Sequence, residues 1–413
     1  MKQLIIKSAL LAAALIMPGK SLAYDFMVDG IAYNILSEST CEVTSYIVTN
    51  QNRYGGDITI PEQVTYDGVT RTVTQIGDDA FNECIRLTSV DIPNSVTTIG
   101  DYAFGHCSKK LKNVNIGNSV TTIGYALFEG CTGLTSVEIS NSVTTIESYA
   151  FYGCTSLASI EIPNSVTTIG SSAFHGCTSL VSIDFPNTVT TIERSTFNGC
   201  TSLMGFDFPN SVAVIGDYAF QDCKGFTSIV IPNSVTTIGE GAFSGCSNIR
   251  ELVFEDNEEE LILDWMAFSG CSFAKLYVGR NLTCKQTVYG YLINFIYLTD
   301  VTIGNLVTDV TAILWDMNKN LASIKSLATT PPTTREFTDT QYRNVTVSVP
   351  AGSLDKYKEH DIWKKFSNIR EDTPTGIGNV DIPDGQDIKV ENGNIVVDNA
   401  KGRVSVYDVA ARW

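Results

Sequence analysis

Residues 147–180 have the sequence ESYAFYGCTSLASIEIPNSVTTIGSSAFHGCTSL, in which one pattern occurs twice. Phe151 and Cys154 form a Phe-x-x-Cys motif, and Phe174 and Cys177 repeat it 23 residues later. The whole chain contains nine such pairs, 23 residues apart except for single steps of 24 and 25: Phe81/Cys84, Phe104/Cys107, Phe128/Cys131, Phe151/Cys154, Phe174/Cys177, Phe197/Cys200, Phe220/Cys223, Phe243/Cys246 and Phe268/Cys271. Repetition at such a period indicates a solenoid, in which successive coils of the chain stack on one another.

The residues between two motifs predict how each coil buries its apolar side. Ile160 and Ile162 alternate with polar residues, which predicts a half-buried strand, and Val166 and Ile169 predict a second short extended or 3₁₀ segment. One coil cannot close a core by itself, so each position must stack on its own copy in the next coil. The leucine position stays apolar throughout: Leu87, Leu111, Leu134, Leu157, Leu180, Leu203, Phe226 and Ile249.

The repeated unit resembles the BspA-like leucine-rich repeat, which occurs in bacterial surface proteins of the Bacteroidetes type. The likeness covers residues 77–281 and rests on positions that recur at the fixed period, among them Ala150, Phe151, Gly153, Cys154, Leu157, Ile160, Ile162, Pro163, Val166, Ile169, Ala173, Phe174 and Cys177. The resemblance implies a β-rich leucine-rich-repeat solenoid made of short strands and turns or 3₁₀ segments. It also implies a secreted or cell-surface protein that acts by adhesin-like binding.

Two segments are predicted to cap the solenoid, because an uncovered terminal coil would expose its apolar cross-section. Residues 24–76 form the N-terminal cap and a first degenerate repeat, with a hairpin turn expected near Asp67-Gly68. Residues 282–371 contain degenerate repeats and a C-terminal cap, in which Tyr357 and Trp363 are expected to cover the last coil.

Residues 1–23 have the organisation of a secretory signal peptide. Lys2 and Lys7 come first, an apolar stretch follows, and Ala23 stands at the expected cleavage site before Tyr24. That stretch is too short for a permanent membrane helix, and no later run of about 18 apolar residues follows. We expect a protein without a transmembrane segment that is secreted or placed on the outer surface of a Gram-negative bacterium.

Residues 372–413 are predicted to form a linker and a partial sorting-type β segment. Alternating residues predict strands at 388–390, 395–397 and 404–408. The segment resembles the start of a type IX secretion C-terminal sorting domain in Gly393, Ile395, Val397, Gly402, Val404, Val406, Tyr407 and Asp408. The family pattern continues through further strands, whereas this sequence ends at Trp413.

The eleven cysteines allow two interpretations. Export favours disulfides. Stacked cysteines, however, would place their Cβ atoms about 5 Å apart rather than the roughly 3.8 Å that a disulfide prefers, and a buried cysteine packs as a small hydrophobe. We therefore expect the nine repeat cysteines to be reduced core thiols, and we leave Cys41 and Cys284 open. The sequence has no Cys-x-x-Cys pair, which disfavours zinc binding and thioredoxin-like chemistry.

Composition and motifs argue against several functional classes. The net charge of −17 and the lack of basic runs disfavour a nucleic-acid partner. The chain has only three histidines, His106, His175 and His360, and no nucleophile elbow, metalloprotease motif or phosphate loop. The acidic run Glu255–Glu260 lacks the ligand order of an EF-hand, so a charged loop is preferred to a calcium site. We predict no enzyme activity, no cofactor and no metal.

The outward position of the predicted strand supplies the candidate binding face. Eight coils place there Asp91, Asn115, Glu138, Glu161, Asp184, Asp207, Val230 and Val253. The five carboxylates Asp91, Glu138, Glu161, Asp184 and Asp207 form the candidate face, which would attract cations or a basic partner. We expect no pocket, so an extracellular protein or glycan, such as a host matrix protein, fits this face best. The alternatives are simple solvation of a passive structural protein, or a hydrolase with an unrecognised site.

Overall fold

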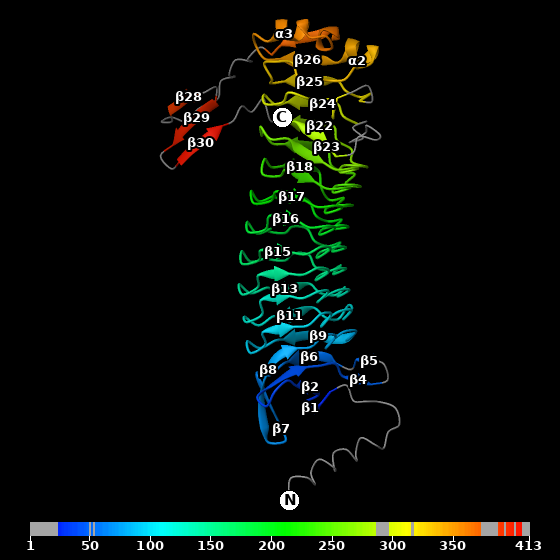
Figure 1. Ribbon diagram of the computed structural model, residues 1–413, viewed down its shortest axis with the longest axis vertical. Coiled ribbons are helices and arrows are strands. Elements are labelled where there is room, and N and C mark those ends of the chain that lie inside the picture. Colours follow the sequence, from blue (N-terminus) through cyan, green and yellow to red (C-terminus); the bar gives the residue numbers. More distant parts are fainter. Residues whose placement is uncertain are drawn as a thin grey trace, which may run out of the picture. The chain divides into compact units, whose positions relative to one another are not determined.

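A computed structural model gives the fold of the chain (Figure 1). The structure describes residues 24–48, 51–52, 54–285, 297–314, 318–372, 387–391, 394–399 and 402–406; the predicted signal peptide lies outside them. The chain divides into two compact units, Met1–Glu371 and Asp372–Trp413. The first unit is a β-solenoid, which confirms the fold class that the 23-residue period predicts (Figure 1).

Each coil has three sides, and the coil that follows Phe226 shows them clearly. Strand β18 (Ser228–Ile231) forms the first side, and its inward residues Ile229 and Ile231 are buried. Strand β19 (Thr237–Ile238) forms the second side. The third side is the turn that contains Phe243, and it returns the chain to the start of the next coil. The alternation of buried and exposed residues in β18 is the pattern that the sequence predicts for the first side.

The first sides of successive coils pair in parallel as two sheets. One sheet consists of β6 (Gly55–Thr59), β9 (Arg86–Asp91), β11 (Asn113–Asn115) and β13 (Ser136–Glu138). The other consists of β18, β20 (Glu251–Phe254), β22 (Lys275–Val278), β24 (Asp300–Ile303), β25 (Ser323–Ser326), β26 (Thr346–Val349) and β27 (Asn368–Glu371). Between the two sheets, an isolated bridge joins Glu161 to Asp184. The predicted strand at Ile160 and Ile162 is thus reduced to a bridge, although both isoleucines are buried.

The second sides are extended rather than 3₁₀, which resolves the choice that the sequence left open. They form three parallel ladders, in which every strand except the longer β8 has two or three residues. The first ladder is β8 (Val69–Ile76) with β10 (Thr98–Ile99), and the second is β12 (Thr122–Ile123), β14 (Thr145–Ile146) and β15 (Thr168–Ile169). The third is β16 (Thr191–Ile192), β17 (Val214–Ile215), β19, β21 (Leu261–Leu263) and β23 (Leu282–Cys284). In most of these strands the isoleucine faces the core and its neighbour faces outward.

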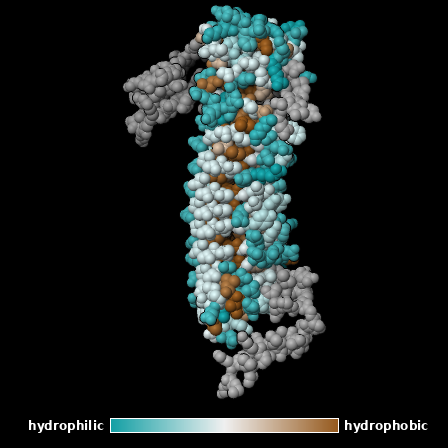
Figure 2. All heavy atoms as spheres, in the orientation of Figure 1, coloured by the Kyte–Doolittle hydropathy of each residue, from teal (hydrophilic) through white to brown (hydrophobic). Residues whose placement is uncertain are grey.

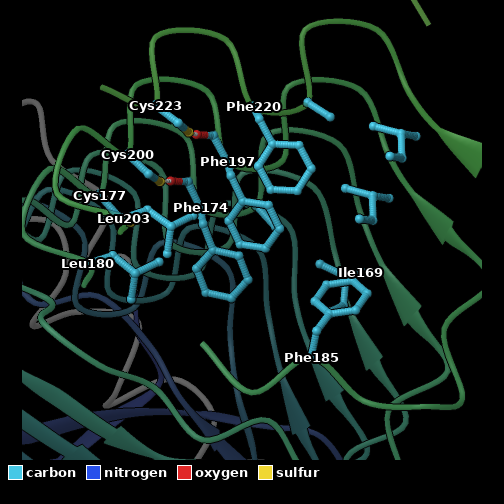
Figure 3. Packing of buried hydrophobic residues seen from close by; sticks show 14 of the residues in the cluster. Ile169, Phe174, Cys177, Leu180, Phe185, Phe197, Cys200, Leu203, Phe220 and Cys223 are labelled. Atoms are coloured by element: carbon cyan, nitrogen blue, oxygen red, sulfur yellow. Dashed lines mark hydrogen bonds between the residues drawn. The ribbon is translucent and has the colours of Figure 1, made fainter. Parts of the chain in front are cut away.

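The third sides carry a continuous file of phenylalanine rings, which we call the phenylalanine spine. Its nine members, Phe81 to Phe268 in the repeat motif, are all buried. Ring centroids of consecutive members are 5.0 to 5.6 Å apart and their planes differ by only 2° to 21°. Figure 3 shows Phe174, Phe197 and Phe220 in this file. Nearly parallel rings at such separations are offset, which is a favourable geometry for two aromatic quadrupoles.

Backbone hydrogen bonds hold each third side on the next. Phe151 N donates to Ala173 O at 2.8 Å, and Gly153 N donates to His175 O at 2.8 Å. Each turn needs two residues in the left-handed region, one of them two positions after the phenylalanine, as at Gly153 (φ 69°) and Gly176 (φ 72°). Glycine recurs there because it adopts this conformation without steric cost.

The two ends of the solenoid are covered by different elements. At the N-terminal end, β1 (Phe26–Val28), β2 (Ile31–Ile35) and β3 (Thr40–Val43) form an antiparallel meander, and β7 (Gln63–Tyr66) pairs with β8 through a hairpin at Asp67-Gly68, as predicted. At the C-terminal end, α2 (Asp339–Asn344), α3 (Leu354–Glu359) and the 3₁₀ turn η1 (Trp363–Lys365) cover the last coil. Trp363 is fully buried and its Nε1 donates to Pro332 O at 2.7 Å. Caps at both ends are therefore confirmed.

Two short hairpin strands complete the first unit, and one small sheet forms the second. Strands β4 (Ile47–Val48) and β5 (Gln51–Asn52) pair in antiparallel fashion. In the second unit, β28 (Asp387–Glu391), β29 (Asn394–Asn399) and β30 (Gly402–Val406) form an antiparallel meander. The first two strands lie where the alternation in the tail predicts them. The predicted third strand, 404–408, overlaps β30 at 404–406, and residues 407–408 lie outside the described residues.

The glycine position of the turn offers a direct test of this backbone description. We expect Gly176→Ala to lower the free energy of unfolding by about 1 kcal/mol, because an L side chain is strained at φ 72°. A Cβ atom there would meet Gly153 Cα at 3.8 Å, an ordinary contact, so crowding contributes little. Urea unfolding followed by circular dichroism measures the change. The control is Ser182→Ala, at an exposed position on the first side of the same coil. An unchanged midpoint for Gly176→Ala would contradict the backbone assignment.

Candidate functional site

The five predicted carboxylates all lie on the first side of the solenoid and are exposed: Asp91, Glu138, Glu161, Asp184 and Asp207. Asp91, Asn115 and Glu138 occupy directly paired positions of β9, β11 and β13. Glu161 and Asp184 face each other across the isolated bridge. Parallel pairing fixes this column, because equal registers bring the same outward position of each coil side by side.

Three of these carboxylates also line an open groove, which the sequence analysis did not anticipate. Glu138, Glu161 and Asp184 form part of a hollow of about 1310 Å³. Its other residues come from the turns that join the first side to the second: Asn118, Ser140, Asn141, Ser142, Pro163, Asn164, Ser165 and Pro186, together with strand residues on the same coils. Asp91 and Asp207 are not among the lining residues. The face is therefore hollowed rather than flat, although the hollow is open to solvent.

The walls of this groove are fixed by hydrogen bonds between coils. Ser142 Oγ donates to Val120 O at 2.6 Å, and Ser165 Oγ donates to Val143 O at 2.6 Å. Each serine thus ties its turn to the preceding coil. In the sequence, only the recurring Pro-Asn-Ser and Ser-Asn-Ser triplets indicate this wall. How far these residues project from the sheet depends on the conformation of the turns, which the triplets do not specify. The charged residues of the lining are the three carboxylates alone, so the groove is acidic.

The outward column changes character toward the C-terminal coils. After Asp207 the paired positions become apolar and then partly basic, in the order Val230, Val253, Tyr277, Thr302, Lys325, Ser348 and Arg370. Figure 2 shows apolar side chains as a narrow stripe along the coils, with polar side chains on both sides. The sequence analysis followed the column only to Val253, because the repeat degenerates beyond that coil.

The repeat cysteines form a second column, inside the turns and beside the phenylalanine spine. All eleven cysteines have free thiols, and every one except Cys284 is buried. In eight consecutive coils the Sγ atom donates to the carbonyl oxygen of the preceding coil's spine phenylalanine at 3.0 to 3.2 Å. Figure 3 shows two of these bonds, from Cys200 to Phe174 and from Cys223 to Phe197. The thiols therefore serve as hydrogen-bond donors as well as small apolar groups.

Burial makes these thiols poor nucleophiles. Desolvation raises the pKa of Cys200 and of Cys246 from 9.0 to about 12. Because the thiolate is the reactive form, a protonated and buried thiol is inert. Burial lowers the pKa of His175, which favours its neutral form, and its ring stacks on Tyr152 with centroids 4.7 Å apart.

The acidic run Glu255–Glu260 lies between β20 and β21, and its neighbourhood includes one buried cation. Arg280 is fully buried and donates to the carbonyl oxygens of Pro232, Asn233 and Val235. Burial lowers its pKa to about 10, and the nearby Glu255 opposes this shift. Among the described residues, no group of three or more His, Cys, Asp and Glu side chains is arranged to hold a metal ion. The described chain likewise has no helix with the length and hydropathy of a membrane span.

Comparison with known families agrees with the coil geometry. The BspA type leucine rich repeat region matches residues 57–181 and 167–292, as six copies. This chain belongs to the BspA-type leucine-rich repeat family. The family that the repeat residues suggested is thereby confirmed, whereas the sorting segment at the end of this BspA-type chain stays a prediction.

Solved structures of leucine-rich repeat proteins resemble the BspA-type chain. A leucine-rich repeat protein from Bacteroides ovatus ATCC 8483 is 25% identical over 85% of this chain and 100% of its own, with a TM-score of 0.56. The T. pallidum leucine rich repeat protein is 25% identical over 55% of this chain and 90% of its own, with a TM-score of 0.41. A leucine rich cell surface protein from Faecalibacterium prausnitzii A2-165 is 26% identical over 73% and 94%, with a TM-score of 0.42. Curated protein sequences give no match.

Thiol accessibility provides one test of the cysteine column. We expect iodoacetamide to leave the nine repeat cysteines unmodified in the native BspA-type chain at pH 8, because they are buried. In denaturant without reductant, all nine should react, since none is held in a disulfide. Mass spectrometry of the two samples counts the modified thiols. Blocked repeat cysteines in the denatured sample would contradict the free-thiol structure.

Alkaline pH provides a second test. A thiol whose pKa is raised on folding stabilises the native state fully below pH 9 and loses that contribution as pH rises toward about 12. The free energy of unfolding should therefore fall above pH 9, by about 1.4 kcal/mol per pH unit for each thiol whose pKa is raised in this way, as for Cys200 and Cys246. Urea unfolding at pH 8 and pH 10 measures the slope. Cys200→Ala removes one titrating thiol, so it should reduce that slope by about 1.4 kcal/mol per pH unit. A variant with the wild-type slope would contradict the argument.

Proposed function

We propose that this BspA-type protein is secreted or displayed on the outer surface of a Gram-negative bacterium, where it binds a macromolecular partner in an adhesin-like role. Its partner is an extracellular protein or glycan, such as a host matrix protein. The acidic groove lined by Glu138, Glu161 and Asp184 is the observation that supports this proposal most directly. Membership of a leucine-rich-repeat surface-protein family is consistent with protein–protein interaction in general.

The shape of the groove favours an extended partner. Its lining comes from four successive coils, and three of them place Glu138, Glu161 and Asp184 at the same position. A hollow of this openness does not enclose a small metabolite, which usually requires a concave site that buries most of the ligand. A polypeptide or glycan chain that crosses several coils can instead contact each repeat in turn. The uniform negative charge favours a segment with basic side chains.

Binding, rather than catalysis, is the use that the groove supports. Carboxylate pairs act as acid and base when different environments separate their protonation states. Glu138, Glu161 and Asp184 are all exposed and share one solvated environment. The groove therefore supplies no desolvated position in which one carboxyl group would differ from the others. We accordingly propose that the protein is not an enzyme.

The proposed route to the surface uses both ends of the chain. In this proposal, residues 1–23 direct export, residues 24–76 and 282–371 cover the regular coils of 77–281, and residues 372–413 form a linker and part of a sorting domain. The antiparallel meander of β28, β29 and β30 supports the last assignment only as far as its strands. Mass spectrometry of the exported protein would show whether it begins at Tyr24.

A charge-neutralising variant tests the groove. We expect the triple variant Glu138→Gln, Glu161→Gln and Asp184→Asn to bind its partner at least about ten-fold more weakly, because three carboxylates facing a basic segment are lost. The wild-type chain is first screened against immobilised matrix proteins and glycans by surface plasmon resonance. The matched control is Glu38→Gln, Glu62→Gln and Glu359→Gln, which changes the net charge equally at exposed positions outside the groove lining.

Each outcome separates the candidate functions. Weaker binding by the groove variant alone supports the proposal, whereas equal binding by both triple variants would exclude the groove as the contact surface. A wild-type chain that binds no member of the panel would favour a passive structural role at the cell surface.

A further inference from the structure

A row of tyrosines on the third side of the solenoid has no role in the core or in the strand-face groove. The tyrosine row consists of Tyr102, Tyr125 and Tyr149, from three successive turns, and all three side chains are partly exposed. Neighbouring rings meet edge to face, with centroids 5.6 Å apart between Tyr102 and Tyr125 and 5.5 Å apart between Tyr125 and Tyr149. The row thus presents a continuous aromatic surface across three coils.

The fold does not require tyrosine at two of these three positions, those of Tyr102 and Tyr149. Tyr102 and Tyr149 adopt left-handed backbone conformations, with φ of 53° and 60°. Two further turns place serine at the equivalent position, Ser172 and Ser195, with φ of 57° and 55°. Bulky residues are uncommon at positive φ, and strained residues of this kind are concentrated at functional sites. A side chain much smaller than tyrosine therefore satisfies the same turn.

The charges around the tyrosine row are negative. The turn segments that carry the three tyrosines, residues 101–106, 124–130 and 147–153, contain Asp101, Glu129 and Glu147 but no lysine or arginine. Asp101 and Glu129 both act on the Tyr102 hydroxyl, whose pKa is raised first by its hydrogen bond with Tyr125 and then by burial and these charges. Aromatic faces and carboxylates together attract cations.

The chain itself holds an arginine against a tyrosine in an equivalent turn of the solenoid. Tyr218 occupies the turn position equivalent to Tyr149, three coils further along. The guanidinium of Arg194 lies over the Tyr218 ring, with Cζ 5.0 Å from the ring centroid. The same guanidinium pairs with Asp217 at 3.3 Å. A tyrosine ring and an adjacent aspartate thus already hold one arginine on the third side of this solenoid.

We propose that the tyrosine row is a second binding surface, which takes arginine side chains of a partner protein by cation–π contact, assisted by Asp101 and Glu129. Arginine fits better than lysine because its planar guanidinium stacks on aromatic rings and pairs with carboxylates at once. This surface is separate from the strand-face groove, and its assignment does not depend on the function proposed for that groove.

A serine triple variant tests the row without altering charge. The probe is a fluorescein-labelled peptide with four arginines separated by Gly-Ser, and its control contains neutral citrulline in place of each arginine. Both are measured by fluorescence anisotropy at 150 mM salt, roughly physiological ionic strength. The full chain carries Glu138→Gln, Glu161→Gln and Asp184→Asn throughout, so that the groove cannot contribute. Tyr102→Ser, Tyr125→Ser and Tyr149→Ser are then added together, and circular dichroism checks that the variant folds.

We expect the arginine peptide to bind about five-fold more weakly, or worse, to the serine variant than to its parent, since each exposed cation–π contact is modest. The citrulline peptide should bind both proteins equally weakly. Equal affinity of the arginine peptide for the serine variant and its parent would overturn the proposal. Equal loss of both peptides would overturn the choice of a cationic partner.

Removal of the internal arginine gives an independent gain-of-binding test. Arg194→Ala leaves the Tyr218 ring and Asp217 without their cation, so binding of the arginine peptide should rise about two-fold or more. Lys224→Ala is the matched control, because it frees Asp222 from its ion pair and changes the net charge equally. An equal rise in both variants would show a charge effect alone and would overturn the role of the ring.

Discussion

The hydrogen bonds that hold each Phe-x-x-Cys turn on the next are the constraint on which the solenoid depends. They run from backbone N–H groups of one turn, such as Phe151 N and Gly153 N, to carbonyl oxygens of the following turn. Their repetition sets the distance between coils at which the phenylalanine rings stack, 5.0 to 5.6 Å between centroids. The same distance lets each thiol reach the phenylalanine carbonyl of the preceding coil. Strand pairing on the other two sides follows the same spacing.

This arrangement separates the interior from the surface. Inward positions must fit a copy of themselves, so each spine ring and each repeat thiol has nearly the same surroundings, and burial of each ring contributes on the order of 2 kcal/mol. Outward positions face solvent and are free to vary from coil to coil. The first side therefore changes from carboxylates near Glu138 to valine at Val230 and arginine at Arg370. The third side changes from tyrosine at Tyr149 to serine at Ser172, although the backbone of the turn has the same left-handed conformation at both positions. Differences in function along the solenoid therefore reside in these outward columns.

Most of the fold could be predicted, because a strict period converts sequence position into spatial position. The strand at β18, the buried file of Phe174 and its copies, the caps and the hairpin at Asp67-Gly68 all lie where the pattern indicates. The order of the outward carboxylates also followed from the period, including the pairing of Glu161 with Asp184. The groove beside them did not, because it depends on how far the turns at Asn141 and Asn164 project from the sheet. A residue pattern records which positions recur, but not the path of the backbone between them.

The sequence by itself determined that the chain forms stacked coils, which residues point inward, and which carboxylates share one column, because periodicity and polarity are properties of the order of residues. Only the tertiary structure decided that the thiols donate to phenylalanine carbonyls, that the acidic column borders a hollow, and that Arg194 rests on Tyr218. Each of these contacts joins atoms of different coils, more than 20 residues apart in the chain. Their geometry depends on turn dihedral angles and on the exact offset between coils, neither of which is encoded in a local pattern.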